Sequence, residues 1–235
     1  MLPSHSAGSV RAVAAMIDHT LLKPQATAAD IRRLCQEARQ YQFVTACVNP
    51  YWVPLAAAEV AGSPVLVAAV VGFPLGANTA AIKVAETEDS IAAGAREIDM
   101  VLNVGELCGG NLNAVHTDIA AVVAAAHARG AVVKVILETA LLTDDQKKAA
   151  CDLSKRAGAD FVKTSTGFST HGATAHDVAL MRGIVGPEMG VKASGGIRTL
   201  EDLQAMRAAG ANRIGTSSGI QIIKALQQAA QGASS

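Results

Sequence analysis

The stretch Val65-Leu-Val-Ala-Ala-Val-Val-Gly-Phe73 is a valine-rich and almost uninterrupted apolar run. Such a run is typical of a strand that is buried on both faces of a parallel sheet. Seven similar runs recur along the chain, separated mostly by longer amphipathic segments. The eight predicted strands are residues 15–20, 43–49, 65–73, 97–104, 131–139, 160–165, 189–194 and 212–217. This alternation predicts a parallel sheet that is covered by helices.

The segments between the runs carry helix signals. Thr27-Ala-Ala-Asp30 and Thr143-Asp-Asp-Gln146 have the spacing of capping boxes, so helices are expected to begin there, the second one ending at Gly158. Further helices are predicted over residues 78–95, 111–129 and 199–210, and from about residue 219.

Eight strand–helix units predict a single (β/α)8 TIM barrel. A doubly wound open sheet is the alternative, because periodicity alone does not reveal whether a sheet closes. No Pro- or Ser-rich linker divides the chain. We therefore expect one domain over residues 1–235, with about 1–10 as an N-terminal extension and about 230–235 as a C-terminal tail. In such a barrel, function resides at the carboxyl ends of the strands and in the loops that follow them.

Composition excludes several classes of protein. The 235 residues have a formal net charge of zero and only 3% aromatic residues, so the chain lacks the basic field and stacking surfaces of a nucleic-acid binder. Its apolar runs are too short to span a bilayer, and no secretory signal precedes the first strand. The four cysteines form no CxxC pair and are expected to be reduced thiols. We expect a cytoplasmic protein with no membrane partner.

Charged residues interrupt several apolar strands. Lys163 and Lys192 occupy matching places in consecutive runs, where neighbouring strands bring side chains about 4.8 Å apart. Repulsion and burial both disfavour the ammonium form, so at least one of these amines is expected to be neutral and nucleophilic. Asp99 is expected to hold the other ammonium and to move protons through a water. These three groups are sufficient for Schiff-base chemistry on a carbonyl compound.

Two glycine-rich loops predict a phosphate site. Ser194-Gly-Gly196 follows the seventh run, and Gly215-Thr-Ser-Ser-Gly219 follows the eighth. Glycines let the backbone approach an anion, and barrels commonly bind phosphate with these two loops. Arg198 adds a positive charge, and the loop Thr164-Ser-Thr-Gly167 is expected to complete the site.

The sequence bears on three other functions. The segment 215–219 matches the G-x-S-x-G elbow of hydrolases, but no Asp, Glu or His follows Ser217, which excludes the usual order of that triad. The six histidines show no metal-binding spacing, so no metal site is predicted. A non-catalytic barrel that binds a sugar phosphate remains an alternative, because it needs the loops but not the paired lysines.

Phe161-Val-Lys-Thr-Ser-Thr-Gly-Phe168 resembles a motif of the deoxyribose-phosphate aldolases, a family of class I aldolases. The resemblance extends over essentially the whole chain. Its other motifs are Ile17–Leu21, Ala46–Pro50, Val71–Gly76, Glu97–Gly105, Lys134–Thr139 and Val191–Arg198. The ordered set is far more specific than any one motif.

The resemblance implies a TIM barrel that reversibly joins acetaldehyde to D-glyceraldehyde 3-phosphate, giving 2-deoxy-D-ribose 5-phosphate, in deoxyribonucleoside catabolism. It implies no cofactor and a homo-oligomer, dimeric or larger. By motif, Lys163 is the Schiff-base lysine, Lys192 perturbs its pKa, and Asp99 relays protons. The implied phosphate-binding residues are Gly167, Gly195, Gly196, Gly215, Ser217 and Ser218, and the implied pocket residues are Asp18, Thr20, Cys47 and Lys134.

Two departures from the family pattern stand out. Several members carry a C-terminal tyrosine thought to help proton transfer, whereas this chain has no tyrosine after Tyr51. Phe168 occupies a position where some relatives have a lysine, which removes a charged contact to phosphate. Weaker discrimination in favour of the phosphorylated sugar is therefore expected.

Overall fold

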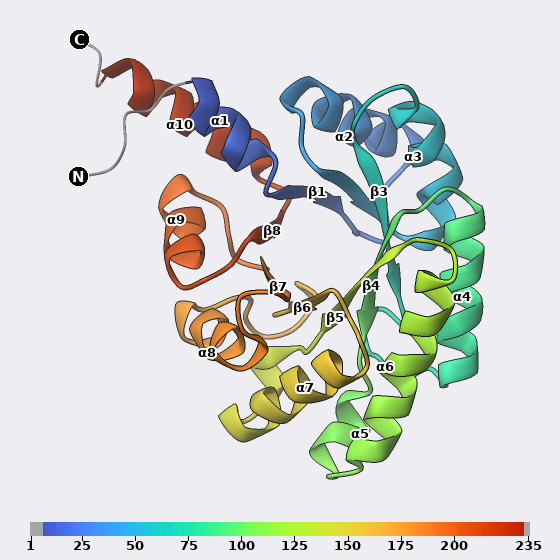
Figure 1. Ribbon diagram of the computed structural model, residues 1–235. Coiled ribbons are helices and arrows are strands. Elements are labelled where there is room, and N and C mark those ends of the chain that lie inside the picture. Colours follow the sequence, from blue (N-terminus) through green and yellow to red (C-terminus); the bar gives the residue numbers. More distant parts are fainter. Residues whose placement is uncertain (1–6, 233–235) are drawn as a thin grey trace.

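The computed structural model describes residues 7–232. Eight parallel strands follow one another around a closed barrel in which β1 pairs with β8, and the helices lie outside it (Figure 1). The predicted TIM barrel is confirmed, and the open-sheet alternative is excluded. The strands are β1 Ile17–Leu21, β2 Thr45–Val48, β3 Leu66–Val71, β4 Glu97–Val101, β5 Val132–Ile136, β6 Phe161–Lys163, β7 Gly190–Ser194 and β8 Arg213–Thr216.

The helices begin largely where the sequence places them. Thr27, Thr143 and Thr199 each close a capping box at the start of a helix. The helices are α1 Ala7–Ala14, α2 Ala28–Tyr41, α3 Val53–Val60, α4 Ala80–Ala92, α5 Val104–Cys108, α6 Leu112–His127, α7 Asp144–Arg156, α8 Ala175–Val185, α9 Leu200–Ala208 and α10 Gly219–Gly232. Short 3-10 turns occur at Pro50–Trp52 and Thr139–Leu141.

The chain ends differ from the expected extension and tail. Part of the predicted extension is helical, because α1 begins at Ala7 and packs against α10 (Figure 1). Helix α10 continues to Gly232, so it includes the first residues of the predicted tail. Residues 1–6 and 233–235 lie outside the described part of the chain.

Several strands are shorter than their apolar runs. β5 ends at Ile136 and not at 139, and β6 ends at Lys163 and not at 165. β5 cannot continue to residue 139, because Glu138 adopts a left-handed conformation with φ of 57°. The residues removed from these strands form the loops above the barrel.

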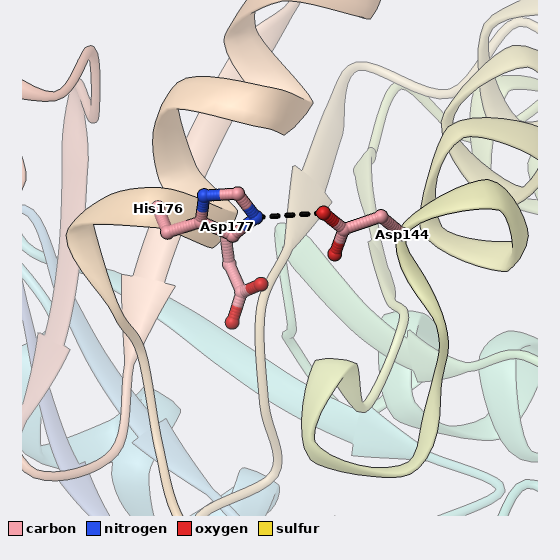
Figure 2. Close-up of side chains that lie close together, drawn as sticks. All are labelled: Asp144, His176 and Asp177. Carbon is pink, nitrogen blue, oxygen red and sulfur yellow. Dashed lines mark hydrogen bonds and ion pairs between the residues drawn. The ribbon is translucent and has the colours of Figure 1, made fainter.

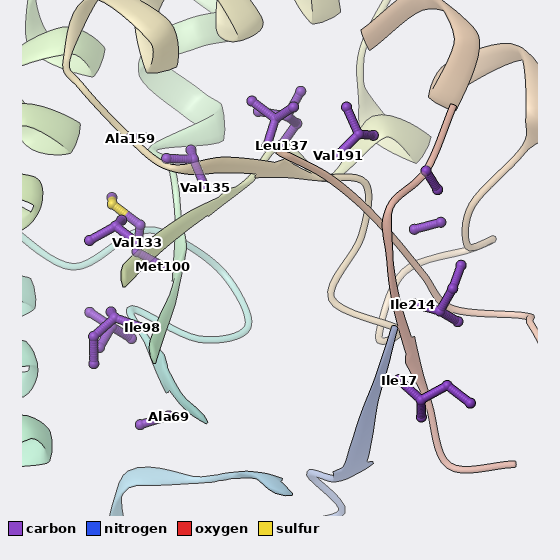
Figure 3. Close-up of a cluster of buried hydrophobic side chains, with 14 of the residues drawn as sticks. Ile17, Ala69, Ile98, Met100, Val133, Val135, Leu137, Ala159, Val191 and Ile214 are labelled. Carbon is purple, nitrogen blue, oxygen red and sulfur yellow. The ribbon is translucent and has the colours of Figure 1, made fainter. Parts of the chain in front are cut away.

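Alternation along the strands separates two kinds of side chain. Ile17, Ile98, Val133 and Val191 belong to the apolar layer between the barrel and the helices (Figure 3). Their sequence neighbours Asp18, Asp99, Lys134 and Lys192 point to the opposite face, which is the inside of the barrel. The interior of the barrel therefore holds these charged side chains together with the small apolar side chains of Cys47, Ala68 and Val70, while the main apolar core lies outside the barrel.

Within residues 7–232, no helix combines the length and apolar composition needed to cross a bilayer.

Candidate active site

Three lysines converge on one carboxylate inside the barrel. Strand register pairs Lys163 with Lys192 and Asp99 with Lys134. The Lys163 and Lys192 Nζ atoms each lie 2.7 Å from Asp99 Oδ2, and Lys134 Nζ lies 2.7 Å from Asp99 Oδ1. All four side chains are buried. Asp99 thus holds both of the lysines that the sequence places on neighbouring strands.

A second tier of ion pairs lies deeper in the barrel. Asp18 bonds Lys192 through one carboxylate oxygen, and its other oxygen lies 2.8 Å from Arg213 Nη1. Glu97 contacts Lys134 and lies 3.0 Å from Arg213 Nη1. The Arg213 guanidinium also stacks over the ring of Phe161, 5.1 Å from its centroid. Every charge in this tier has an opposite charge beside it.

The three lysines differ in proton affinity. Burial lowers the pKa of the Lys163 amine; the Asp99 carboxylate opposes this effect, and the Lys192 ammonium adds to it. Burial would also lower the pKa values of Lys192 and Lys134, but the nearby Asp carboxylates outweigh it and raise both. Lys163 is therefore the lysine of the three that is biased towards the neutral, nucleophilic form. Burial contributes more to this bias than the repulsion stressed in the sequence analysis.

A cavity of about 390 Å³ opens above the ion pairs, and Lys163 lies on its wall. Six of the predicted substrate residues line it: Thr20, Gly167, Gly195, Gly196, Gly215 and Ser217. Arg198, which is predicted to contact the phosphate, also lines the cavity. The predicted phosphate loops also contribute Thr166, Ser194 and Thr216, and Phe168 lies beside them. The lining residues for which no role was predicted are Leu21, Leu22, Lys23 and Ile197.

Four predicted pocket residues lie outside this lining. Asp18 and Lys134 are wholly buried beneath the cavity, because register places Lys134 opposite Phe161, two residues below the level of Lys163. Cys47 is buried in a small apolar cluster with Leu22, and burial raises the pKa of its thiol. Ser218 donates its backbone N–H to Thr216 Oγ1 and is not part of the lining.

The glycine loops have the conformations that an anion site requires. Gly167, Gly195 and Gly196 have φ values of 85°, 83° and 79°, which favour glycine. A Cβ on Gly215 would lie 2.3 Å from Ser194 Oγ and 3.0 Å from Lys192 Cε, so a side chain there would displace these neighbours. Helix α10 begins two residues after Ser217, which places the positive end of its dipole at this rim.

One buried carboxylate holds a cavity loop in place. Glu138 is 4% exposed and accepts hydrogen bonds from the backbone N–H and the hydroxyl of Thr166. The Thr166 hydroxyl oxygen in turn accepts from the N–H of Phe168 at 3.1 Å. No role was predicted for Glu138 from the sequence. The only sequence signal for such a role is its position near the end of the fifth predicted strand, residues 131–139.

A family model described as DeoC/LacD family aldolase matches residues 12–225. The chain belongs to this aldolase family. The resemblance inferred from the motifs is therefore confirmed, and the barrel, its paired lysines and its cavity are those of an aldolase-family protein.

Relatives in the aldolase family match nearly the whole chain. A deoxyribose-phosphate aldolase of Lysinibacillus sphaericus is 59% identical over 213 residues, covering 91% of this chain and 95% of the relative. The deoxyribose-phosphate aldolase of Brevibacillus brevis is 61% identical over 207 residues, covering 88% of this chain and 93% of the relative. A solved tetrameric deoxyribose phosphate aldolase from Aeropyrum pernix superposes with a TM-score of 0.88 at 38% identity, covering 94% of each chain.

One cluster in this aldolase-family chain has the composition of a metal site. Asp144, His176 and Asp177 bring ligand atoms within 4.8 Å of one another (Figure 2). The Lys147 ammonium lies 3.1 Å from Asp144 Oδ1 and 2.6 Å from Asp177 Oδ1, so a cation already neutralises these carboxylates. The cluster links the first turns of α7 and α8 and lies outside the cavity lining.

Proposed function

We propose that this chain is a class I deoxyribose-phosphate aldolase, which cleaves 2-deoxy-D-ribose 5-phosphate to D-glyceraldehyde 3-phosphate and acetaldehyde. The observation that carries the proposal is the Lys163 amine on the cavity wall, with its pKa lowered by burial and its Nζ held by Asp99. The names of relatives at 59% and 61% identity support the choice of substrate.

The reaction begins with nucleophilic attack by Lys163. Its neutral Nζ adds to C1 of the open-chain sugar, and loss of water from the resulting carbinolamine gives a protonated imine. The Asp99 carboxylate beside Nζ stabilises this cation by charge attraction. No further cofactor is needed, because the imine itself accepts the electrons of the next step.

The carbon–carbon bond then breaks between C2 and C3. The C3 hydroxyl loses its proton, the bonding pair moves towards the imine nitrogen, and glyceraldehyde 3-phosphate leaves. Protonation of the two-carbon enamine at C2 and hydrolysis release acetaldehyde and regenerate Lys163. Burial alone would raise the pKa of Asp99, but the charges of Lys134, Lys163 and Lys192 outweigh it and hold this pKa well below its ordinary value. Asp99 is therefore a weak base. We infer that it relays this proton through water and acts mainly by stabilising the imine.

The glycine loops, with Lys23 and Arg198, would bind the 5-phosphate. Phe168 gives this part of the cavity an apolar wall, and its ring lies edge-on to Phe73 with centroids 5.4 Å apart. We expect Phe168→Lys to increase the preference for deoxyribose 5-phosphate over deoxyribose, measured as a ratio of kcat/KM, by about tenfold. The added cation would contact the phosphate, and a hydrogen bond to a charged group contributes roughly 1.5–3 kcal/mol. Leu75→Lys, on an exposed residue outside the lining, is the control. A wild-type preference already as large as that of Phe168→Lys would contradict this role for Phe168.

Glu138 is expected to act on phosphate binding through Thr166. Glu138→Ala removes the acceptor that orients the 166–168 turn and should raise KM for deoxyribose 5-phosphate by about tenfold, since a hydrogen bond to a charged group contributes roughly 1.5–3 kcal/mol. Its kcat should change little, and Glu138→Gln, which retains an acceptor oxygen, should recover most of the binding. If kcat falls while KM stays constant, Glu138 does not act through the phosphate loop.

Steady-state turnover tests the proposal against a non-catalytic sugar-phosphate-binding barrel. Purified protein supplied with deoxyribose 5-phosphate should release acetaldehyde and glyceraldehyde 3-phosphate in equal amounts without added metal. A binder would show a saturable affinity for the sugar phosphate and release neither aldehyde, which would overturn the proposal.

We further propose a single domain over residues 1–235 that forms a homo-oligomer, a dimer or larger, in the cytoplasm. The tetrameric structure of the Aeropyrum pernix relative supports self-association. Light scattering on the purified full-length chain measures this directly, and a monomer at micromolar concentration would contradict it.

A further inference from the structure

The ion pairs inside the barrel form one continuous network. It begins at Arg213 and Glu97, the first residues of β8 and β4, and ends at Lys163, the last residue of β6. Only Lys163 among its members lines the cavity. Its basic groups are Lys134, Lys163, Lys192 and Arg213, and its carboxylates are Asp18, Glu97 and Asp99.

The charges of this network balance when one of its four basic groups is neutral, and Lys163 is the one whose pKa is lowered. Three cations, Lys134, Lys192 and Arg213, then face the three carboxylates. A proton on Lys163 would leave one uncompensated positive charge in the buried interior, which is unfavourable because burial penalises net charge. The nearby Cys47 thiol is buried with a raised pKa and so stays uncharged. Charge balance thus explains why one lysine of this group is driven to neutrality.

The pKa directions agree with this count. Despite burial, carboxylate neighbours raise the pKa values of Lys134, Lys192 and Arg213. Despite burial, cationic neighbours lower those of Asp18 and Asp99. Among the network's lysines and arginine, Lys163 alone shifts towards its neutral form.

We propose that Arg213 and Glu97 are positioning residues that set the proton affinity of Lys163 through charge balance, although neither contacts the cavity. The proposal rests on Lys163 being the nucleophile of the proposed function. Arg213 is suited to this role because its guanidinium bridges Asp18 and Glu97 and its side chain is 12% exposed. Solvent therefore screens it little.

The two residues should shift the pKa of Lys163 in opposite directions. Arg213→Met leaves the network one negative charge in excess, which a proton on Lys163 would neutralise, so the pKa of Lys163 should rise. Glu97→Gln leaves one positive charge in excess, so that pKa should fall. Each shift is expected to be on the order of one pKa unit. A merely structural disturbance would not give opposite signs.

The test is the pH dependence of Schiff-base formation. The full-length wild type, Arg213→Met, Arg213→Lys and Glu97→Gln are mixed with acetaldehyde, and the imine is trapped with borohydride and quantified on the Lys163 peptide. Arg213→Met should shift the acid limb of the trapping profile to higher pH, Glu97→Gln should shift it to lower pH, and Arg213→Lys should resemble the wild type.

A double variant that keeps the net charge of the network serves as a control for misfolding of the single variants. Arg213→Met with Glu97→Gln removes one cation and one anion, so its trapping profile should return to the wild-type position. Shifts of both single variants in the same direction, no shift in either, or a double variant that stays displaced would each overturn the inference. Absence of any adduct on Lys163 of the wild type would instead overturn the proposed function.

Discussion

Replacing Lys163 with methionine is expected to lower kcat for cleavage of deoxyribose 5-phosphate by about 10⁴-fold or more, because covalent catalysis through the imine is lost completely. Methionine is unbranched and close to lysine in length, so it removes the amine with little change in packing. Because the substitution also removes a buried group whose pKa is lowered, we expect it to leave the fold intact. Coupled detection of glyceraldehyde 3-phosphate measures the loss.

Lys83→Met is the matched control for this substitution. Lys83 is wholly buried, bonds Asp118, and donates to the carbonyl oxygen of Val101 at 2.9 Å, but it lies outside the cavity lining. Its removal should lower thermal stability, since it leaves Asp118 unpaired, while kcat remains near that of the wild type. A Lys163→Met protein that retains more than about a tenth of wild-type kcat would contradict a covalent role for this lysine.

Replacing Lys192 with leucine is expected to raise the pKa of Lys163 towards its free value of about 10.4 and to reduce turnover at neutral pH by about 10²-fold or more. Removal of this cation takes away a repulsive neighbour, and it leaves Asp18 and Asp99 with one negative charge in excess. Lys163 must lose its proton before it attacks, so a raised pKa depletes the reactive form at neutral pH and less so at higher pH.

The pH–rate profile distinguishes this effect from a simple loss of packing. For Lys192→Leu, activity should recover partly as the pH is raised above 9, because the neutral form of Lys163 then becomes populated. A profile parallel to that of the wild type, merely lower at every pH, would show that Lys192 does not set the proton affinity of Lys163.

The fold was predictable because the outer faces of the strands and the helix caps obey local rules. The run 65–73 is apolar along its length, and Thr27, Thr143 and Thr199 start helices at the residues that their capping boxes indicate. Helix α1 could not be placed, because its eight residues carry no capping box and rest on α10, which lies at the other end of the chain.

The paired lysines and the glycine loops were also readable, because equivalent positions on consecutive strands become neighbours. The depth of a side chain within the barrel could not be predicted from the sequence. Asp18 and Lys134 look like pocket residues in sequence, but both are wholly buried, and register places Lys134 two residues before the level of Lys163. Arg213 and Glu97 lie 116 positions apart and resemble ordinary charges at strand ends. Their ion pair forms only because the barrel closes, and no local sequence pattern predicts closure.

The most direct test of the central claim is the identity of the lysine that forms the imine at neutral pH. The full-length protein is incubated with acetaldehyde, reduced with borohydride, digested and mapped by mass spectrometry. We predict that one ethyl group is added at Lys163, with Lys134 and Lys192 unmodified because their ammonium groups stay protonated. An adduct on Lys192, or none on any lysine of the barrel interior, would contradict the account.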